Sequence, residues 1–313
     1  MATKDCWFVK SLNEDARWDK FWSFSFICVM TWFKDVWFII NYYLKRFHWL
    51  SLDVVAGAMV THVIASRIPN GHGKVSWAST ICVGIAVFSI YVIDRLLDNR
   101  KLSSNTTLRH RFHAQNEGTL LKVLALLGLL GIVCLFWLPS PMFLIGIGLT
   151  LLVGIYLFAV FKTSFSNYFQ LLKEPLVACI YTAGIWGTAL VALPHTIWEN
   201  YVLMMLFGSV AFQNLLLFSW FESFEVEEGH SLAIEWGTET VSKMLGWLAI
   251  MVVMVAIGVL VFTEHRYCVR AAVVVALMSI SLHLLKRQPK KVLINERYRW
   301  LGDGVFLLTL WLL

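Results

Sequence analysis

Long apolar runs alternate with short polar segments along most of this chain. Nearly all of the runs are close to the length of a helix that crosses the hydrocarbon core of a bilayer, about 20 residues. Residues 20–46 are rich in aromatic side chains but are interrupted by Lys34 and Asp35, a pattern typical of a helical segment lying on the membrane surface. We predict nine membrane-spanning helices, at residues 49–66, 76–97, 119–138, 141–161, 175–193, 201–221, 240–263, 268–285 and 299–313.

This pattern predicts an all-α polytopic membrane protein. We expect a nine-transmembrane-helix bundle at residues 49–313, preceded by an interfacial N-terminal segment at residues 1–48. Composition agrees, because 58% of the 313 residues are hydrophobic, only 15% are charged and the mean hydropathy is +0.69. A soluble domain of this length would not carry so much apolar sequence.

The segments between the spans divide the charges unevenly. Nine spans place 22 of the 26 Lys and Arg residues on the side of the N-terminus, so the positive-inside rule predicts that the N-terminus is cytoplasmic. The net charge of +6 comes with no basic tract interleaved with aromatic residues, so nucleic acid is not an expected partner. The six cysteines are scattered and show neither a disulfide framework nor CxxC metal spacing.

A pair of carboxylates closes the second predicted span, in the run "YVIDRLLDNRK". Asp94 and Asp98 are four residues apart, so they share one helix face where the helix leaves the lipid. Two adjacent carboxylates repel each other, and a divalent cation between them removes that repulsion. Mg²⁺ fits such a site because it takes carboxylate and phosphate oxygens. The simpler alternative is that these acids pair with Arg95 and Arg100.

The sixth predicted span ends in a similar way, in the run "NLLLFSWFESFEVEEGHSLA". Asn214 lies inside the span, and Glu222 and Glu225 are three residues apart, so they can share a helix face. Gly229 is typical of a left-handed helix cap after these acids. An ordinary acidic loop is the alternative interpretation.

Further polar residues are predicted at the same cytoplasmic depth. Asp53 opens the first span, Lys173 precedes the fifth, and Asp303 opens the ninth between two glycines. In the loop "RHRFH", Arg109 and Arg111 have the guanidinium geometry that holds a diphosphate bidentately, although a positive-inside loop is the alternative. Acids and cations around one end of an apolar bundle suit a ligand with a polyanionic head and an apolar tail, such as an isoprenyl diphosphate.

With these motifs in this order, most of the chain resembles the UbiA-type intramembrane prenyltransferase superfamily. The first acidic motif of that superfamily, NDxxDxxxD, matches "IYVIDRLLD", which keeps Asp94 and Asp98 but has Ile90 and Tyr91 in place of the leading Asn and Asp. The second motif resembles "FESFEVEEGHSLA", with Glu in place of Asp throughout. The chain looks most similar to a divergent bacterial branch with a comparable "RHRF" loop and a late Asp in its last helix.

The resemblance implies an enzyme that uses Mg²⁺ to transfer an isoprenyl group from a prenyl diphosphate to an aromatic or lipid acceptor in the bacterial inner membrane. The expected catalytic and metal-binding residues are Asp94, Asp98, Glu222 and Glu225. The expected substrate-binding residues are Asp53, Tyr91, Arg95, Arg109, Arg111, Lys173, Asn214 and Asp303.

Two other functions are compatible with the same sequence. The loss of the leading Asn and Asp, now Ile90 and Tyr91, favours a non-catalytic lipid-binding or assembly subunit on the same scaffold. A transporter is the third hypothesis. It is disfavoured because His62 is the only ionisable side chain near the centre of a predicted span, and because no inverted repeat is evident.

Overall fold

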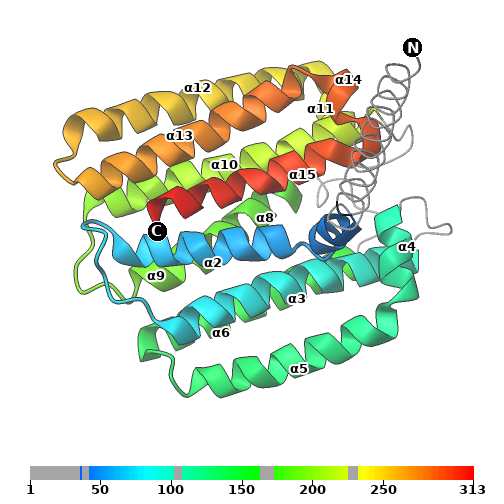
Figure 1. Cartoon of the computed structure of the whole chain (residues 1–313), viewed down its shortest axis with the longest axis horizontal. Helices are drawn as coiled ribbons and strands as arrows, with labels where there is room; N and C mark the ends of the chain where they lie inside the picture. Colours follow the sequence, from blue (N-terminus) through cyan, green and yellow to red (C-terminus); the bar gives the residue numbers. More distant parts are fainter. Residues whose placement is uncertain (1–35, 37–41, 102–107, 163–172, 225–231) are drawn as a thin grey trace, which may run out of the picture. The chain divides into compact units, whose positions relative to one another are not determined.

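The computed structural model describes residue 36 and residues 42–101, 108–162, 173–224 and 232–313 (Figure 1). By its internal contacts the chain divides into two compact units, Met1–Trp49 and Leu50–Leu313. The described part of the first unit is mainly the helix Tyr42–Trp49, which exposes aromatic and aliphatic side chains along its length. Most of the predicted interfacial segment lies outside the described residues, and its role stays a prediction.

Every element described in the second unit is a helix, and no strand occurs among the described residues, which confirms the all-α class. The elements are α2 (Leu52–Arg67), α3 (Trp77–Lys101), α4 (Leu108–Gln115), α5 (Glu117–Leu135), α6 (Ser140–Lys162), α8 (Lys173–Thr182), the π-helix η1 (Ala183–Gly187), α9 (Thr188–Leu190), α10 (Trp198–Glu222), α11 (Leu232–Trp236), α12 (Thr238–Phe262), α13 (Arg266–Lys286), α14 (Pro289–Val292), the 3₁₀-helix η2 (Ile294–Glu296), α15 (Arg297–Gly304) and the 3₁₀-helix η3 (Val305–Leu312).

Each predicted span falls on a helical segment, although not all of these segments are single long helices. Among the described residues, six are long and apolar enough to cross a membrane: α3, α5, α6, α10, α12 and α13. A seventh candidate, α2, passes the same test when it is counted with the short helix before it. The fifth predicted span is divided into α8, η1 and α9, and the ninth into α15 and η3. The polytopic membrane class is therefore confirmed, while the number nine stays a prediction.

The helices of the second unit run side by side as a bundle (Figure 1). Helix α10 packs against α8, α12 and α13, while α2 packs against α3, η1 and η3. At the edge of the bundle α5 contacts α3 and α4 and exposes most of its leucines. Such an apolar surface is unfavourable in water but matches hydrocarbon, so α5 is a lipid-facing helix.

Two glycines bring α2 and α15, the helices that carry Asp53 and Asp303, close to their neighbours. A Cβ on Gly57 of α2 would lie 2.7 Å from the Cβ of Phe306 in η3. A Cβ on Gly302 of α15 would lie 2.5 Å from Cε1 of Phe218 and 2.6 Å from Oδ1 of Asn214, both in α10. No other residue type fits these approaches without movement. Gly57 therefore allows α2 to lie close to η3, and Gly302 allows α15 to lie close to α10.

Candidate functional site

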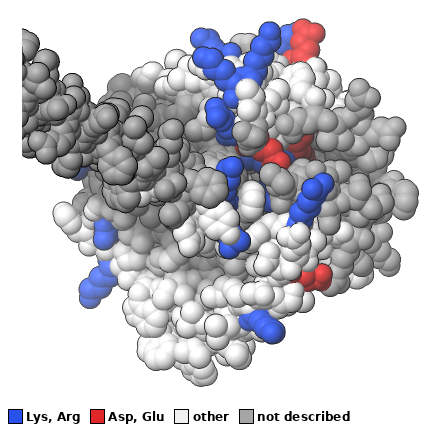
Figure 2. All heavy atoms as spheres, turned by 45° about the vertical axis from the view of Figure 1, so that its right-hand side comes forward, with Lys and Arg blue, Asp and Glu red and all other residues white. Residues whose placement is uncertain are grey.

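The candidate site lies at the right-hand end of the bundle in Figure 1, where α10 ends. It is formed by the end of α10, the end of α3, helix α4 and the starts of α8 and α15. Within the part of the chain that the structure describes, the Glu222 carboxylate interacts electrostatically with four cations from four helices: Arg299, Arg109, Arg95 and Lys173. Figure 2 shows Lys and Arg side chains gathered over this end, with few acids among them. Four cations from four helices therefore surround the Glu222 carboxylate.

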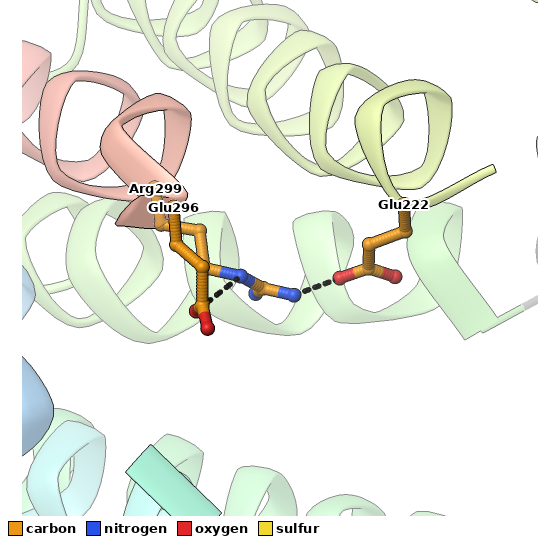
Figure 3. Close-up of polar contacts among 3 residues, drawn as sticks. All are labelled: Glu222, Glu296 and Arg299. Atoms are coloured by element: carbon orange, nitrogen blue, oxygen red, sulfur yellow. Dashed lines mark hydrogen bonds and ion pairs between the residues drawn. The ribbon is translucent and has the colours of Figure 1, made fainter. Parts of the chain in front are cut away.

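Arg299 is the direct partner of Glu222. Its guanidinium donates to the Glu222 carboxylate, and its Nε lies 3.6 Å from Oε2 of Glu296 (Figure 3). The guanidinium carbon also lies 5.3 Å from the ring centre of Tyr298 and 5.5 Å from that of Phe218. Two carboxylates and two aromatic rings thus fix Arg299 in one orientation, because ion pairing and cation–π attraction act together.

Arg109 is in a different situation. Its side chain is only 8% exposed, and Nε is buried without a hydrogen-bond partner. None of the described residues forms an ion pair with its guanidinium. Burial and the neighbouring charges of Arg299 and Arg95 hold the pKa of the Arg109 guanidinium well below its usual range. A buried cation next to two like charges is unfavourable by itself and is stabilised by an incoming anion.

Helix α4 determines which arginine of the "RHRFH" loop faces inward. The Nδ1–H of His113 donates to the main-chain carbonyl of Arg109 at 3.0 Å, and both side chains are buried. They are four residues apart, so they share the inner face of α4, whereas Arg111 is exposed. Burial, with the nearby charges of Arg95 and Arg109, lowers the pKa of His113 below its ordinary value of 6.5, so this ring is neutral near pH 7.

A second polar group lies beside α10. Asn214 donates from Nδ2 to Oδ1 of Asp303 at 3.2 Å, and carboxylate oxygens of Asp53 and Asp303 lie within 4.8 Å of each other. All three side chains are buried. The phenol of Tyr91 interacts electrostatically with both of these acids and also with Asp94. Tyr91 therefore lies between the Asp53–Asp303 pair and Asp94 near the end of α3, and its role in binding substrate stays a prediction.

Only part of the predicted Mg²⁺ site lies among the described residues. The Asp98 side chain and Glu225 lie outside the described residues, Asp94 is half-buried near the end of α3, and Glu222 pairs with Arg299. Within the described part of the chain, neither Asp94 nor Glu222 belongs to a group of three acids or histidines close enough to hold an ion. Two carboxylates one turn apart on α3, completed by phosphate oxygens, still match the donor preference of Mg²⁺, so its binding there stays a prediction.

The structure also brings in residues that the sequence reasoning missed, above all Arg299, Glu296 and His113. Two of these residues stand four positions from a neighbour in the same site: Arg299 precedes Asp303 by four residues, and Arg109 precedes His113 by four. That spacing indicates a shared face only once the segment is known to be helical. Of the predicted set, Arg95, Arg109, Lys173 and Glu222 meet in one cluster, and Asp53, Tyr91, Asn214 and Asp303 meet in the other.

Comparisons with known proteins give one distant match. No protein-family model matches the sequence, and no curated protein matches it. A solved structure described as a digeranylgeranylglyceryl phosphate synthase in membranes matches at 18% identity and a TM-score of 0.46, over 82% of this chain and 91% of that one. The match describes a distant likeness of helical arrangement and says nothing about catalysis in this chain.

Proposed function

We propose that this membrane protein transfers an isoprenyl group from a prenyl diphosphate to a hydrophobic acceptor within the bilayer, in a reaction that requires Mg²⁺. The observation that carries the proposal is the buried Arg109 guanidinium, which lies beside Arg95 and Arg299, forms no ion pair among the described residues and leaves its Nε without a hydrogen-bond partner. A diphosphate supplies several oxygens to such a cluster, and guanidinium groups bind phosphate oxygens bidentately. The apolar bundle next to the cluster suits the isoprenyl tail.

The charged residues of the site each have a role in the proposed transfer reaction. Arg109, Arg95 and Lys173 bind the diphosphate and stabilise the charge that it gains when the allylic carbon–oxygen bond breaks and the electron pair leaves with the diphosphate. Mg²⁺ held by Asp94 and Asp98 would supply further neutralisation of that leaving group. The ring of Tyr91 faces the developing carbocation as a cation–π partner. The acceptor then forms the new bond to the allylic carbon and loses a proton.

The surrounding helices exclude water from the reactive carbon, because a carbocation exposed to water would be hydrolysed. We place this site at the cytoplasmic face, as the distribution of Lys and Arg predicts. The acceptor is an aromatic or lipid molecule, since only an apolar acceptor would be concentrated in the bilayer beside these helices.

One observation favours the alternative, a non-catalytic subunit that binds a polyanionic lipid. Glu222 is paired with Arg299 and is 39% exposed, so this acid of the second motif is already neutralised without a metal. If the second motif holds no metal, the site binds a prenyl diphosphate or a similar lipid without cleaving it. Both functions use Arg109, and they differ only in turnover.

A transfer assay separates the two. We would incubate the purified chain with radiolabelled geranylgeranyl diphosphate and a bacterial membrane lipid extract, with and without Mg²⁺, and measure protein-bound label, released diphosphate and labelled product. The proposal expects Mg²⁺-dependent release that is lost in Arg109→Met and in Asp94→Asn but kept in Lys122→Met, a change at an exposed lysine of α5. Binding of the label without any release would support the non-catalytic alternative, and absence of binding would overturn both.

A further inference from the structure

An open groove of about 290 Å³ lies between α12 and α13, outside the proposed prenyl diphosphate site. Its wall is mainly one face of α12, because Ser242, Gly246 and Ile250 repeat at intervals of four residues along that helix, as do Lys243 and Trp247. The lining residues are Ser242, Lys243, Gly246, Trp247, Ile250 and Lys286. None of them takes part in the cluster around Glu222.

The middle of the groove is deepened by a glycine that the packing of the protein does not require. A Cβ placed on Gly246 would meet nothing within 4 Å among the described atoms. Glycine is less favourable than alanine in the interior of a helix, so this position gives up helix stability and gains open space. Trp247, 70% exposed, and Ile250, 56% exposed, continue the groove as an apolar wall.

The two lysines stand at one end of this wall. The ammonium of Lys286 donates to the main-chain carbonyl of Ser242, which uses one of its three hydrogens, and no carboxylate among the described residues pairs with it. Lys243 pairs with Glu239 at 2.8 Å, but both side chains are largely exposed, and such pairs exchange easily for another anion. Exposed Arg287 follows Lys286 directly and adds a further positive charge.

We propose that this groove binds an anionic phospholipid, with the phosphate headgroup on Lys286 and Lys243 and the start of an acyl chain along Trp247 and Ile250. Charge complementarity selects this occupant: basic pockets between membrane helices attract anionic headgroups, whereas a zwitterionic lipid would bring its own cation against the lysines. The exposed Trp247 fits the interfacial depth at which headgroup and chain meet. A free phosphate would leave the apolar wall unused.

The test is a lipid titration followed by native mass spectrometry, with the purified full chain in a maltoside detergent. The probes are phosphatidylglycerol, phosphatidylcholine with the same acyl chains, and glycerol phosphate as the headgroup without a tail. The variants are Lys243→Met, Lys286→Met, the double variant and Gly246→Leu, which fills the groove and keeps both charges. Lys122→Met on α5 is the matched control, since it removes an exposed lysine that does not line the groove.

We expect phosphatidylglycerol to bind more tightly than phosphatidylcholine, and glycerol phosphate not to bind. Each lysine removed should weaken phosphatidylglycerol about fivefold, and both together about thirtyfold, because a lysine at an anionic membrane surface contributes about that factor. Gly246→Leu should abolish the preference without any change of charge, which keeps the test decisive if the double variant does not fold. Equal binding of the two lipids, or an unchanged preference in Gly246→Leu, would overturn the proposal.

Discussion

Two buried polar groups in this bundle differ in how fully their hydrogen-bonding capacity is used. His62 in α2 is completely buried, and its ring nitrogens lie 2.9 Å from the main-chain oxygen of Ile185 and 3.0 Å from Oγ of Ser79. Arg109 in α4 is also buried, yet its Nε has no hydrogen-bond partner, and Glu222 and Glu296 act on its guanidinium only electrostatically, without an ion pair among the described residues. The first group is complete within the protein, whereas the second leaves a buried donor unsatisfied.

We interpret the difference as that between a structural role for His62 and the proposed binding role for Arg109. His62 ties α2 to α3 and to the π-helix η1, where the main chain departs from α-helical hydrogen bonding. A buried polar group with all its partners stabilises one arrangement of helices, whereas a buried unpartnered cation costs stability until its ligand arrives. His62, alone near a span centre in the sequence, is thus accounted for without transport.

The largest expected effect comes from Arg109→Met. It removes the buried cation, so affinity for a prenyl diphosphate should fall roughly a thousandfold, because truncating one member of a buried charge pair costs about 4 kcal/mol. The ligand-free protein should become more stable, because the unpartnered charge is gone. Thermal unfolding with and without geranylgeranyl diphosphate measures both. A ligand-free variant that unfolds earlier than the wild type would show that Arg109 is structural.

His62→Ala should produce the opposite pattern. It removes the His62 hydrogen bonds to the Ile185 carbonyl and the Ser79 hydroxyl and opens a cavity, so stability should fall by about 3 kcal/mol. Affinity of the folded protein for the diphosphate should stay within about twofold. Ser79→Ala, which removes one hydrogen bond, should cost about 1 kcal/mol. A His62 variant that folds normally but does not bind the diphosphate would erase the distinction between the two groups.

Glu222→Gln tests the same comparison inside the cation cluster, at the ion pair with Arg299. It removes the carboxylate that neutralises Arg299, so affinity for a diphosphate in the absence of Mg²⁺ should rise about tenfold. Because Glu222 is partly exposed, the loss of the ion pair should cost only about 1 kcal/mol of stability. Isothermal titration with inorganic diphosphate measures the affinity. Weaker binding without Mg²⁺ would mean that Glu222 positions Arg299 for the ligand and is not its competitor.

The smallest expected effect is on pH dependence through His113. Its folded-state pKa lies below 6.5, so the neutral form stabilises the fold above that pH, and this contribution is lost as the pH falls from 6.5 toward the folded-state pKa. The slope should not exceed about 1.4 kcal/mol per pH unit. His113→Gln should remove it, and bound diphosphate should reduce it by neutralising Arg95 and Arg109. Melting temperatures between pH 5 and 8 that do not depend on His113 would contradict this.

The sequence pattern predicted the helical bundle but only part of the candidate site. Apolar runs predicted every helical segment of the membrane region, because lipid imposes one requirement on all of them. The loop after the first acid pair was predicted without its helix, so Arg109 and Arg111 looked equivalent, whereas α4 turns one inward and leaves the other exposed. Arg299 was missed because its ion pair joins residues 77 positions apart, a contact that only the packing of α15 on α10 creates.

The most direct test of the central claim is the thermal stability of the purified chain with geranylgeranyl diphosphate, for the wild type and for Arg109→Met, with and without Mg²⁺. Ligand that binds only the folded state must raise the melting temperature. We predict a clear rise for the wild type, no rise with geranylgeraniol, which lacks the diphosphate, and no rise for Arg109→Met. An equal rise in the variant, or no rise in the wild type at any Mg²⁺ concentration, would contradict a diphosphate site at Arg109.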